Sequence, residues 1–135
     1  MKREYEFIRI KPYSDARGIL KKIITESRLP KDTHIEEVYL LYTNQGAVRG
    51  NHYHEKALEY FTVVSGTASI VLKDLETGVT EKVEITSGDN AVLKVPVRTI
   101  HSFKNEAEEP LIMLAISTRE YDELDNDTYP MRILE

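Results

Sequence analysis

Residues 46–66 read GAVRGNHYHEKALEYFTVVSG. Two runs rich in β-branched and aromatic residues flank a short polar link, which is typical of two β-strands. Because side chains alternate across a strand, His52 and His54 point to the same face. Glu59 begins the second run and can return to that face. The stretch therefore predicts a hairpin-like unit that carries three potential metal ligands.

The same strand pattern extends over the rest of the chain. Apolar runs are separated by turn residues about every 8–12 positions, which is typical of an all-β sandwich or barrel. Ser65-Gly66 stands between two strong runs and predicts a hairpin there. Helical periodicity is limited to single turns, expected at Glu26–Leu29 and Glu120–Leu124. The expected strands lie near Tyr5–Ile10, Ile19–Thr25, Ile35–Thr43, Val48–His54, Glu59–Val64, Thr67–Leu72, Val79–Ile85, Asn90–Val95, Ile100–Lys104 and Leu111–Ser117.

Composition narrows the class of protein. The chain has 135 residues with a net charge of -5, which disfavours a nucleic-acid binder because such proteins carry excess Lys and Arg. Cysteine is absent, so a metal must be bound by imidazole and carboxylate groups. The charged N-terminus and the lack of an 18-residue apolar run predict a cytoplasmic protein with no membrane segment. We expect one domain over residues 1–135.

His101 can complete a ligand set with His52, His54 and Glu59. An H-x-H pair often arises by chance, but the chain has only four histidines and three belong to this set. His34 is expected to be an ordinary surface residue. Three imidazoles and one carboxylate suit one divalent ion, with Zn as the first choice and Fe, Mn, Ni or Co as the others.

The spacing resembles that of the cupins. Their first motif, G-x5-H-x-H-x4-E-x6-G, matches every fixed position from Gly46 to Gly66. The second motif is met more loosely, because seven residues rather than five separate Gly88 from Pro96 and Arg98 replaces a glycine. His101 and Asn105 keep their spacing from Pro96. The resemblance, with its motifs in residues 46–105, implies a single-domain cupin, a jelly-roll barrel of the double-stranded β-helix type.

Other segments resemble cupins that act on nucleotide sugars. Asp15–Gly18 is similar to the D-x-R-G segment of enzymes that epimerise or isomerise 4-keto nucleotide sugars. Arg49–His54 resembles the R-G-N-H-Y-H run of the C-terminal cupin domain in capsular-polysaccharide reductase/epimerases. Glu37–Tyr42 and the tail from Ser117 to Tyr129 are similar to dTDP-sugar 3,4-ketoisomerases, and the tail also to the capsular domains. The ketoisomerases generally work without a metal, so the complete ligand set favours the epimerase group.

This resemblance implies an isomerase that abstracts a proton beside the keto group of the sugar. The base should be a histidine with a pKa near neutrality, His54 or His52. Since a histidine bound to metal is a poor base, one of these two is expected to be a weak ligand, or Glu59 or a metal-bound hydroxide takes the proton. Tyr121 is the main candidate acid, with Tyr42 as the second choice.

Arg17 and Arg49 are candidates for binding the substrate diphosphate, because guanidinium pairs bidentately with phosphate oxygens. Arg98, beside the second motif, is a third candidate for substrate binding, at the mouth of the cavity. For Arg17 and Arg49, ordinary surface charge is an equally good explanation.

Two other functions remain open at this point. A cupin can bind a carbohydrate without catalysis, and an Fe-loaded site of this kind can be an oxygenase. We also expect a homodimer, with Tyr5–Ile10 as a strand that could be exchanged. Because capsular epimerase domains normally follow a reductase domain, a separate reductase is a possible partner.

Overall fold

The computed structural model describes residues 5–134. Most of the charged N-terminal stretch that argues against a signal peptide, residues 1–4, lies outside the described part. Among the described residues, no helix is long and apolar enough to cross a membrane.

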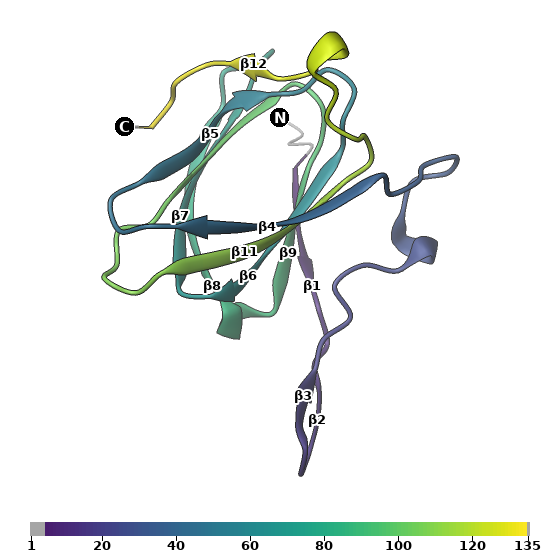
Figure 1. Ribbon diagram of the computed structural model, residues 1–135, viewed down its shortest axis with the longest axis vertical. Coiled ribbons are helices and arrows are strands. Elements are labelled where there is room, and N and C mark those ends of the chain that lie inside the picture. Colours follow the sequence, from purple (N-terminus) through teal and green to yellow (C-terminus); the bar gives the residue numbers. More distant parts are fainter. Residues whose placement is uncertain (1–4, 135) are drawn as a thin grey trace.

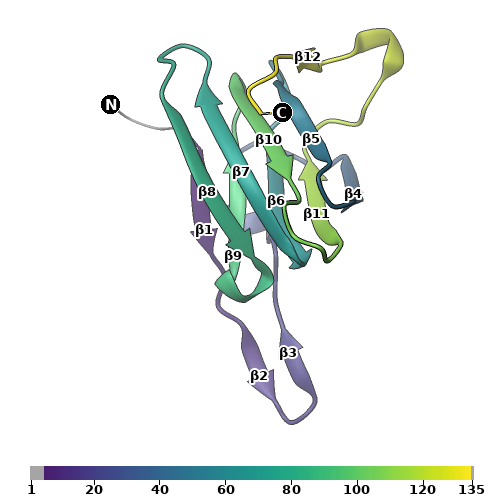
Figure 2. The same ribbon diagram turned by 90° about the vertical axis from the view of Figure 1, so that its left-hand side faces the viewer.

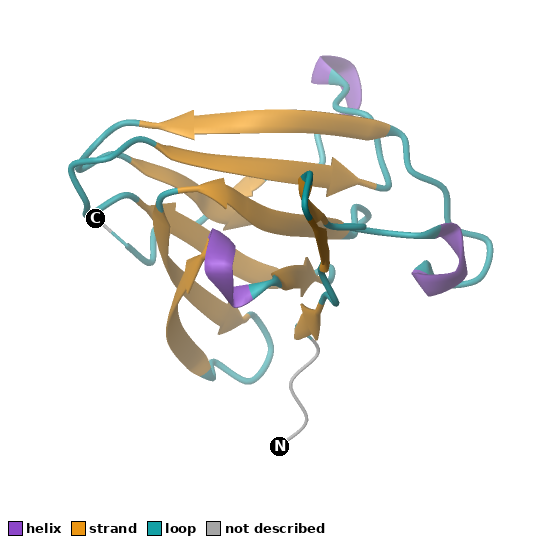
Figure 3. Cartoon of the chain, turned by 90° about the horizontal axis from the view of Figure 1, so that it is seen from below, coloured by secondary structure: helices purple, strands orange, loops and turns teal. Residues whose placement is uncertain are grey.

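The described chain is built from antiparallel strands and three short 3-10 turns, which confirms the all-β prediction (Figure 3). The strands pair as two five-stranded sheets, ordered β1-β9-β6-β11-β4 and β12-β5-β10-β7-β8, and one small hairpin, β2-β3. The two large sheets face each other and form a jelly-roll barrel (Figure 2). The strands are β1 Glu6–Arg9, β2 Tyr13–Asp15, β3 Gly18–Leu20, β4 Glu37–Thr43, β5 Val48–Tyr53, β6 Glu59–Ser65, β7 Thr67–Asp74, β8 Thr80–Thr86, β9 Ala91–Val95, β10 Thr99–Lys104, β11 Leu111–Ser117 and β12 Tyr129–Pro130; the 3-10 turns are η1 Glu26–Arg28, η2 Ser87–Asp89 and η3 Glu123–Asp125.

The prediction of a hairpin at Ser65-Gly66 is wrong, because the two strands that flank these residues do not pair with each other. β6 pairs with β9 and β11, whereas β7 pairs with β8 and β10 in the opposite sheet. Gly66, at a φ of +87°, is the one residue between the two strands and passes the chain from one sheet to the other. A single residue is too short for a hairpin loop, so the two strands pair elsewhere.

The prediction of a hairpin-like unit for the metal ligands is also wrong, because its two strands lie in different sheets. β5 pairs with β10 and β12, so it belongs to the opposite sheet from β6. His52 and Glu59 therefore approach each other across the barrel instead of along one sheet. Local alternation correctly predicted the face of each side chain but not its strand partner, because pairing depends on residues distant in sequence.

Two segments differ from the predicted strands. Of the expected strand Ile19–Thr25, only Ile19 and Leu20 are paired in a sheet; they belong to β3, which forms with β2 the hairpin that leaves the barrel (Figure 1). Ile23 and Ile24 pack instead against a small apolar cluster around Tyr60, on the outer side of the sheet. The two-residue strand β12 was not predicted because it contains Pro130, which lacks a ladder donor and is typical of sheet edges.

The main core fills the space between the sheets. It contains Phe61, Leu72, Leu93, Phe103 and Met113, each 3% exposed or less. Asn105 closes one side of it, since its buried amide donates to the carbonyl oxygens of Thr43 at 2.9 Å and Glu109 at 2.8 Å. The amide side chain thus joins the end of β4 to the loop before β11.

Candidate active site

A bulge in β5 places the first two histidines. The pairing register of β5 with β10 shifts beside Gly50, and His52 becomes the direct partner of His101. A Cβ on Gly50 would lie 2.6 Å from the carbonyl oxygen of His101, so only glycine fits where the two strands approach. The backbone at Asn51 is left-handed, with a φ of +57°. The Gly50-Asn51 pair thus brings two imidazoles side by side from adjacent strands.

Asn51 also holds the C-terminal tail. Its side-chain amide donates to the carbonyl oxygen of Leu134 at 2.7 Å, and its oxygen accepts from the backbone N–H groups of Ile133 and Leu134. Just before this point, Tyr129 of β12 stacks on Tyr53, with ring centroids 5.2 Å apart. The tail therefore lies against β5, on the strand that carries His52.

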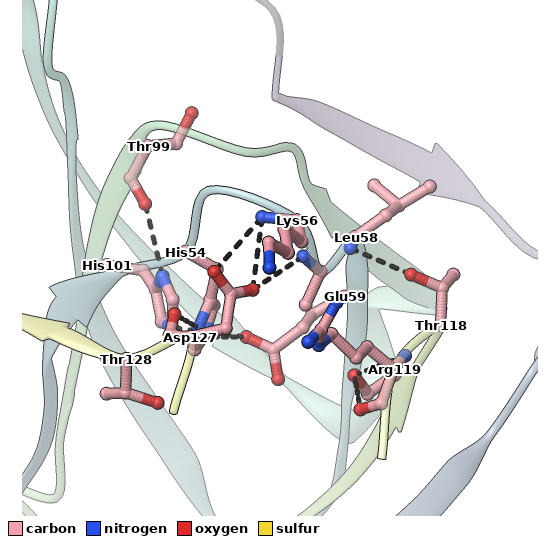
Figure 4. Close-up of polar contacts among 12 residues, drawn as sticks. His54, Lys56, Leu58, Glu59, Thr99, His101, Thr118, Arg119, Asp127 and Thr128 are labelled. Carbon is pink, nitrogen blue, oxygen red and sulfur yellow. Dashed lines mark hydrogen bonds and ion pairs between the residues drawn. The ribbon is translucent and has the colours of Figure 1, made fainter. Parts of the chain in front are cut away.

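The four predicted ligand residues meet at one point inside the barrel. Donor atoms of His52, His54, Glu59 and His101 all lie within 4.8 Å of one another. Glu59 Oε1 lies 2.6 Å from His54 Nε2 and 3.5 Å from His101 Nε2 (Figure 4). The side chains of Glu59 and His101 are 5% and 1% exposed. The cluster is thus enclosed by the barrel and has the dimensions of a single-ion site.

Backbone carbonyls orient the His54 and His101 rings by binding the ring nitrogen that faces away from the cluster. Nδ1 of His54 donates to the carbonyl oxygen of Asp127 at 2.9 Å, and Nδ1 of His101 donates to that of Thr99 at 3.2 Å. Each contact leaves Nε2 directed into the cluster. Tyr39 holds the carboxylate in the same way, since its hydroxyl donates to Glu59 Oε2 at 2.9 Å. Such outer contacts fix the orientation of metal-binding groups.

Burial sets the charge states of the cluster. It lowers the pKa of His52 to about 4 and also lowers the pKa of His101. Burial opposes charge on Glu59 as well, but contact with His54 and the charges of His101 and His54 outweigh it and hold the pKa of Glu59 at about 2. At neutral pH the protein therefore presents two neutral imidazoles and a carboxylate, the forms that bind metal ions.

His54 behaves differently from the other two rings. Burial acts to lower its pKa, but contact with the Glu59 carboxylate and the nearby Asp127 outweigh this and raise the pKa. Its Nε2 and Glu59 Oε1 are buried and, although 2.6 Å apart, are not aligned as a hydrogen bond. Two lone pairs at this distance need either a proton on His54 Nε2 or a metal cation beside them. The four residues fit a divalent ion on this ground.

A cavity of about 130 Å³ opens beside the cluster. Its inner wall contains Tyr39, His52, His54 and Glu59, and its outer wall comes from the C-terminal segment, with Arg119 and Tyr121. Among the described residues that line it, Arg119 carries the only lysine or arginine charge, and it is paired with Asp125. The walls are otherwise acidic, so an anionic substrate has one basic contact here.

Tyr121 thus lines the same cavity as His52 and His54, as its predicted role requires, and the residue is 56% exposed. Arg17 lies elsewhere. It is on the exposed turn of the β2-β3 hairpin, where its guanidinium pairs with Asp15 at 2.6 Å. This hairpin extends from the end of the barrel opposite β12 (Figures 1 and 2).

The other two candidate arginines are also outside the cavity lining. Arg49 donates from Nε to Thr43 Oγ1 at 3.1 Å and from Nη2 to a backbone carbonyl on β4. Arg98 pairs with Glu55 at 2.9 Å and Glu76 at 3.4 Å. Its backbone is left-handed, with a φ of +61°, at the position where the second motif has glycine. In this chain both side chains hold strands and loops together.

Sequence reasoning missed three residues at the site, namely Tyr39, Arg119 and Asp127. Arg119 and Asp127 fall in the tail that resembles nucleotide-sugar cupins, but no spacing rule singles them out. Tyr39 lies on β4 and reaches Glu59 only because β4 and β6 both flank β11.

The two facing sheets and the enclosed His/Glu cluster define a cupin barrel. Within this class the chain belongs to the polysaccharide biosynthesis C-terminal domain family, whose sequence profile matches residues 13–129. A search of curated proteins found no match.

Solved structures with the same fold include the following three proteins. The dTDP-6-deoxy-D-glucose-3,5-epimerase RmlC from Legionella pneumophila, solved with dTDP-4-keto-L-rhamnose, is 18% identical with a TM-score of 0.82, over 96% of this chain and 73% of that one. A 3,4-ketoisomerase from Helicobacter canadensis is 19% identical with a TM-score of 0.78, over 93% and 89%. The capsular polysaccharide assembling protein CapF from Staphylococcus aureus is 21% identical with a TM-score of 0.69, over 93% of this chain but only 33% of CapF.

Proposed function

We propose that this chain is a metal-binding isomerase that acts on a 4-keto nucleotide sugar, as an epimerase or ketoisomerase in surface-polysaccharide or deoxysugar synthesis. The observation that carries the proposal is the convergence of His52, His54, Glu59 and His101 on a cavity that Tyr121 also lines. Membership of a polysaccharide-biosynthesis family supports the pathway. The shared fold with a 3,5-epimerase and a 3,4-ketoisomerase supports the reaction class.

We propose that His52, Glu59 and His101 hold one divalent ion, with Zn as the first choice. Catalytic zinc sites commonly use three protein ligands and leave a position open for substrate or water. When bound, the ion supplies positive charge that stabilises the oxygen of an enolate. His54 can add a fourth donor when no substrate is present.

With three other ligands available, His54 is our candidate for the base. Its Nδ1 proton is held by the Asp127 carbonyl, so Nε2 is the nitrogen that can accept a proton from the sugar. The keto group acidifies the neighbouring C–H bond, and transfer of that proton to Nε2 leaves an enolate. Return of a proton from the hydroxyl of Tyr121 to the other face gives an epimer. A ketoisomer forms when the proton of the adjacent hydroxyl moves to the enolate oxygen through an enediol and the carbon that carried the keto group is then protonated, so that the adjacent carbon becomes the new carbonyl.

The cavity also limits how the substrate binds. Its volume of about 130 Å³ is below the roughly 300–1,000 Å³ of typical ligand pockets, so it accommodates the sugar ring and not the whole nucleotide sugar. The nucleotide would then lie outside, where Arg119 is the nearest basic group of the cavity wall. A reductase from a separate chain could act on the product.

The proposal predicts solvent exchange at carbon. Incubation of the Zn-loaded protein with dTDP- and UDP-4-keto-6-deoxyhexoses in D₂O should place deuterium at C3 or C5 for an epimerase, or at C4 for a 3,4-ketoisomerase, as read by NMR. The His34→Ala variant, which alters an exposed histidine outside the cavity, should exchange at the wild-type rate. Ligand-induced thermal stabilisation without deuterium would favour a binding module, and tightly bound Fe with O₂ uptake would favour an oxygenase.

We also propose that the chain forms a homodimer. The outer face of edge strand β4 exposes Val38, Leu40 and Tyr42, each more than half accessible, and the β2-β3 hairpin exposes Ile19 and Leu20. A row of exposed apolar side chains such as that on β4 is typical of an interface. β1 pairs with β9 of its own chain, so these residues are better supported as the contact than exchange of β1. Light scattering should give twice the mass of the chain, and Leu40→Glu should give the monomer; a monomeric wild type would refute the dimer.

A further inference from the structure

We infer that Asp127 is a positioning residue for His54, an assignment that rests on the catalytic role proposed for that histidine. The chain reaches Asp127 after crossing the outer wall of the cavity, 73 residues beyond His54. Only the contacts of this carboxylate in the structure distinguish it from its acidic neighbours in the sequence.

The carboxylate of Asp127 binds the loop that joins the two parts of the site. Oδ1 accepts from the backbone N–H groups of Glu55 and Lys56 at 3.0 and 3.2 Å, and Oδ2 accepts from those of Lys56 and Ala57 at 3.0 and 2.9 Å. Three consecutive N–H groups thus converge on one carboxylate. Hydrogen bonds to an ionised acceptor are stronger than neutral ones, so this contact anchors the tail firmly.

The backbone of the same residue binds the ring. While the carboxylate holds residues 55–57, the carbonyl oxygen of Asp127 accepts the Nδ1 proton of His54 at 2.9 Å (Figure 4). The loop and the ring are therefore fixed to one residue through two different groups. Since the loop runs from His54 to Glu59, the anchor also limits how far the ring can move from the carboxylate it faces.

This arrangement leaves Nε2 as the nitrogen of His54 that can accept a proton. A carbonyl oxygen can only accept, so Nδ1 must carry a proton and Nε2 is left directed into the cluster, toward Glu59. Without the carboxylate anchor, the tail would no longer hold the carbonyl in place, and the ring could rotate or exchange its Nδ1 proton with water. Asp127 therefore acts through His54 and need not touch the substrate.

The test uses Asp127→Ala and, as a matched control, Asp89→Ala. The Asp89 carboxylate also accepts a backbone N–H, that of Thr86 at 2.7 Å, but it lies in η2 at the end of the barrel opposite β12 (Figure 1). In the metal-free protein, NMR of the imidazole nitrogens should show the Nδ1 proton of His54 exchanging at least about tenfold faster in Asp127→Ala than in wild type. Asp89→Ala should show the wild-type exchange rate.

Catalysis gives a second, independent readout. In Asp127→Ala the kcat for deuterium incorporation should fall by about 10–100-fold, as for other outer-contact residues, with KM and Zn affinity within a few-fold of wild type. If Asp127→Ala does not fold, Asp127→Asn keeps one carbonyl acceptor and should give intermediate exchange. Unchanged Nδ1 exchange in a folded Asp127 variant would overturn the inference. Absence of deuterium incorporation by wild type would refute the proposed function alone, because the exchange measurement needs neither metal nor substrate.

Discussion

Removal of His101 should lower the affinity for Zn by more than about 100-fold, whereas removal of His54 should lower it by less than about tenfold. His101 is 1% exposed and has its Nε2 directed at Glu59, so its loss removes one of the three proposed ligands and leaves an enclosed gap in the cluster. A ligand contact is worth more than the about 10–100-fold typical of an outer contact. Chelator competition on His101→Ala, His54→Ala and wild type measures both effects.

With excess Zn, the order of the two variants should reverse for catalysis: His54→Ala should lose more deuterium incorporation than His101→Ala. Deuterium incorporation should recover partly in His101→Ala, because the base is intact, and should stay absent in His54→Ala. His34→Ala serves as the control in both assays, since this side chain is exposed and outside the cavity lining. Equal loss of Zn affinity in His54→Ala and His101→Ala would make His54 a full ligand and assign the base to another group.

The ligand residues could be predicted from sequence because their chemistry is local. Strand alternation places His52 and His54 on one face, and the motif spacing adds Glu59 and His101. The structure brings these four together as the spacing requires. The strand pairing could not be predicted in the same way, because β5 and β6 are neighbours in the chain but belong to opposite sheets.

The residues that orient the site were hidden for a related reason. Tyr39, Thr99 and Asp127 act through contacts that depend on tertiary structure, and two of the three hydrogen bonds use a backbone carbonyl, which any residue could supply. A backbone contact leaves no signature in side-chain type. Two arginines show the opposite error. The guanidinium groups of Arg49 and Arg98 suggested substrate binding, but in the structure they bind groups of their own protein.

The passage of the chain between the two sheets requires glycine at position 66, and this requirement can be tested by substitution. It ends the first motif, and its φ of +87° alone is a conformation that costs an L-residue about 1–2 kcal/mol. In addition, a Cβ there would lie 2.6 Å from the carbonyl oxygen of Pro110 and 3.1 Å from Cα of Leu111, both backbone atoms that cannot move aside without shifting β11. Overpacking of this kind typically costs a further 1–3 kcal/mol or so.

Gly66→Ala should therefore lower the free energy of unfolding by about 3 kcal/mol, measured by denaturant titration. Gly46→Ala is the matched control, because Gly46 has a similar φ of +79° but a Cβ added there would meet no atom within 4 Å. Its cost should be the conformational strain alone, about 1 kcal/mol. The difference between the two variants isolates the close approach of the β6-β7 crossing to the loop before β11. If both variants lost the same free energy, the approach would contribute nothing, and the passage between the sheets would depend only on the left-handed backbone that both glycines share.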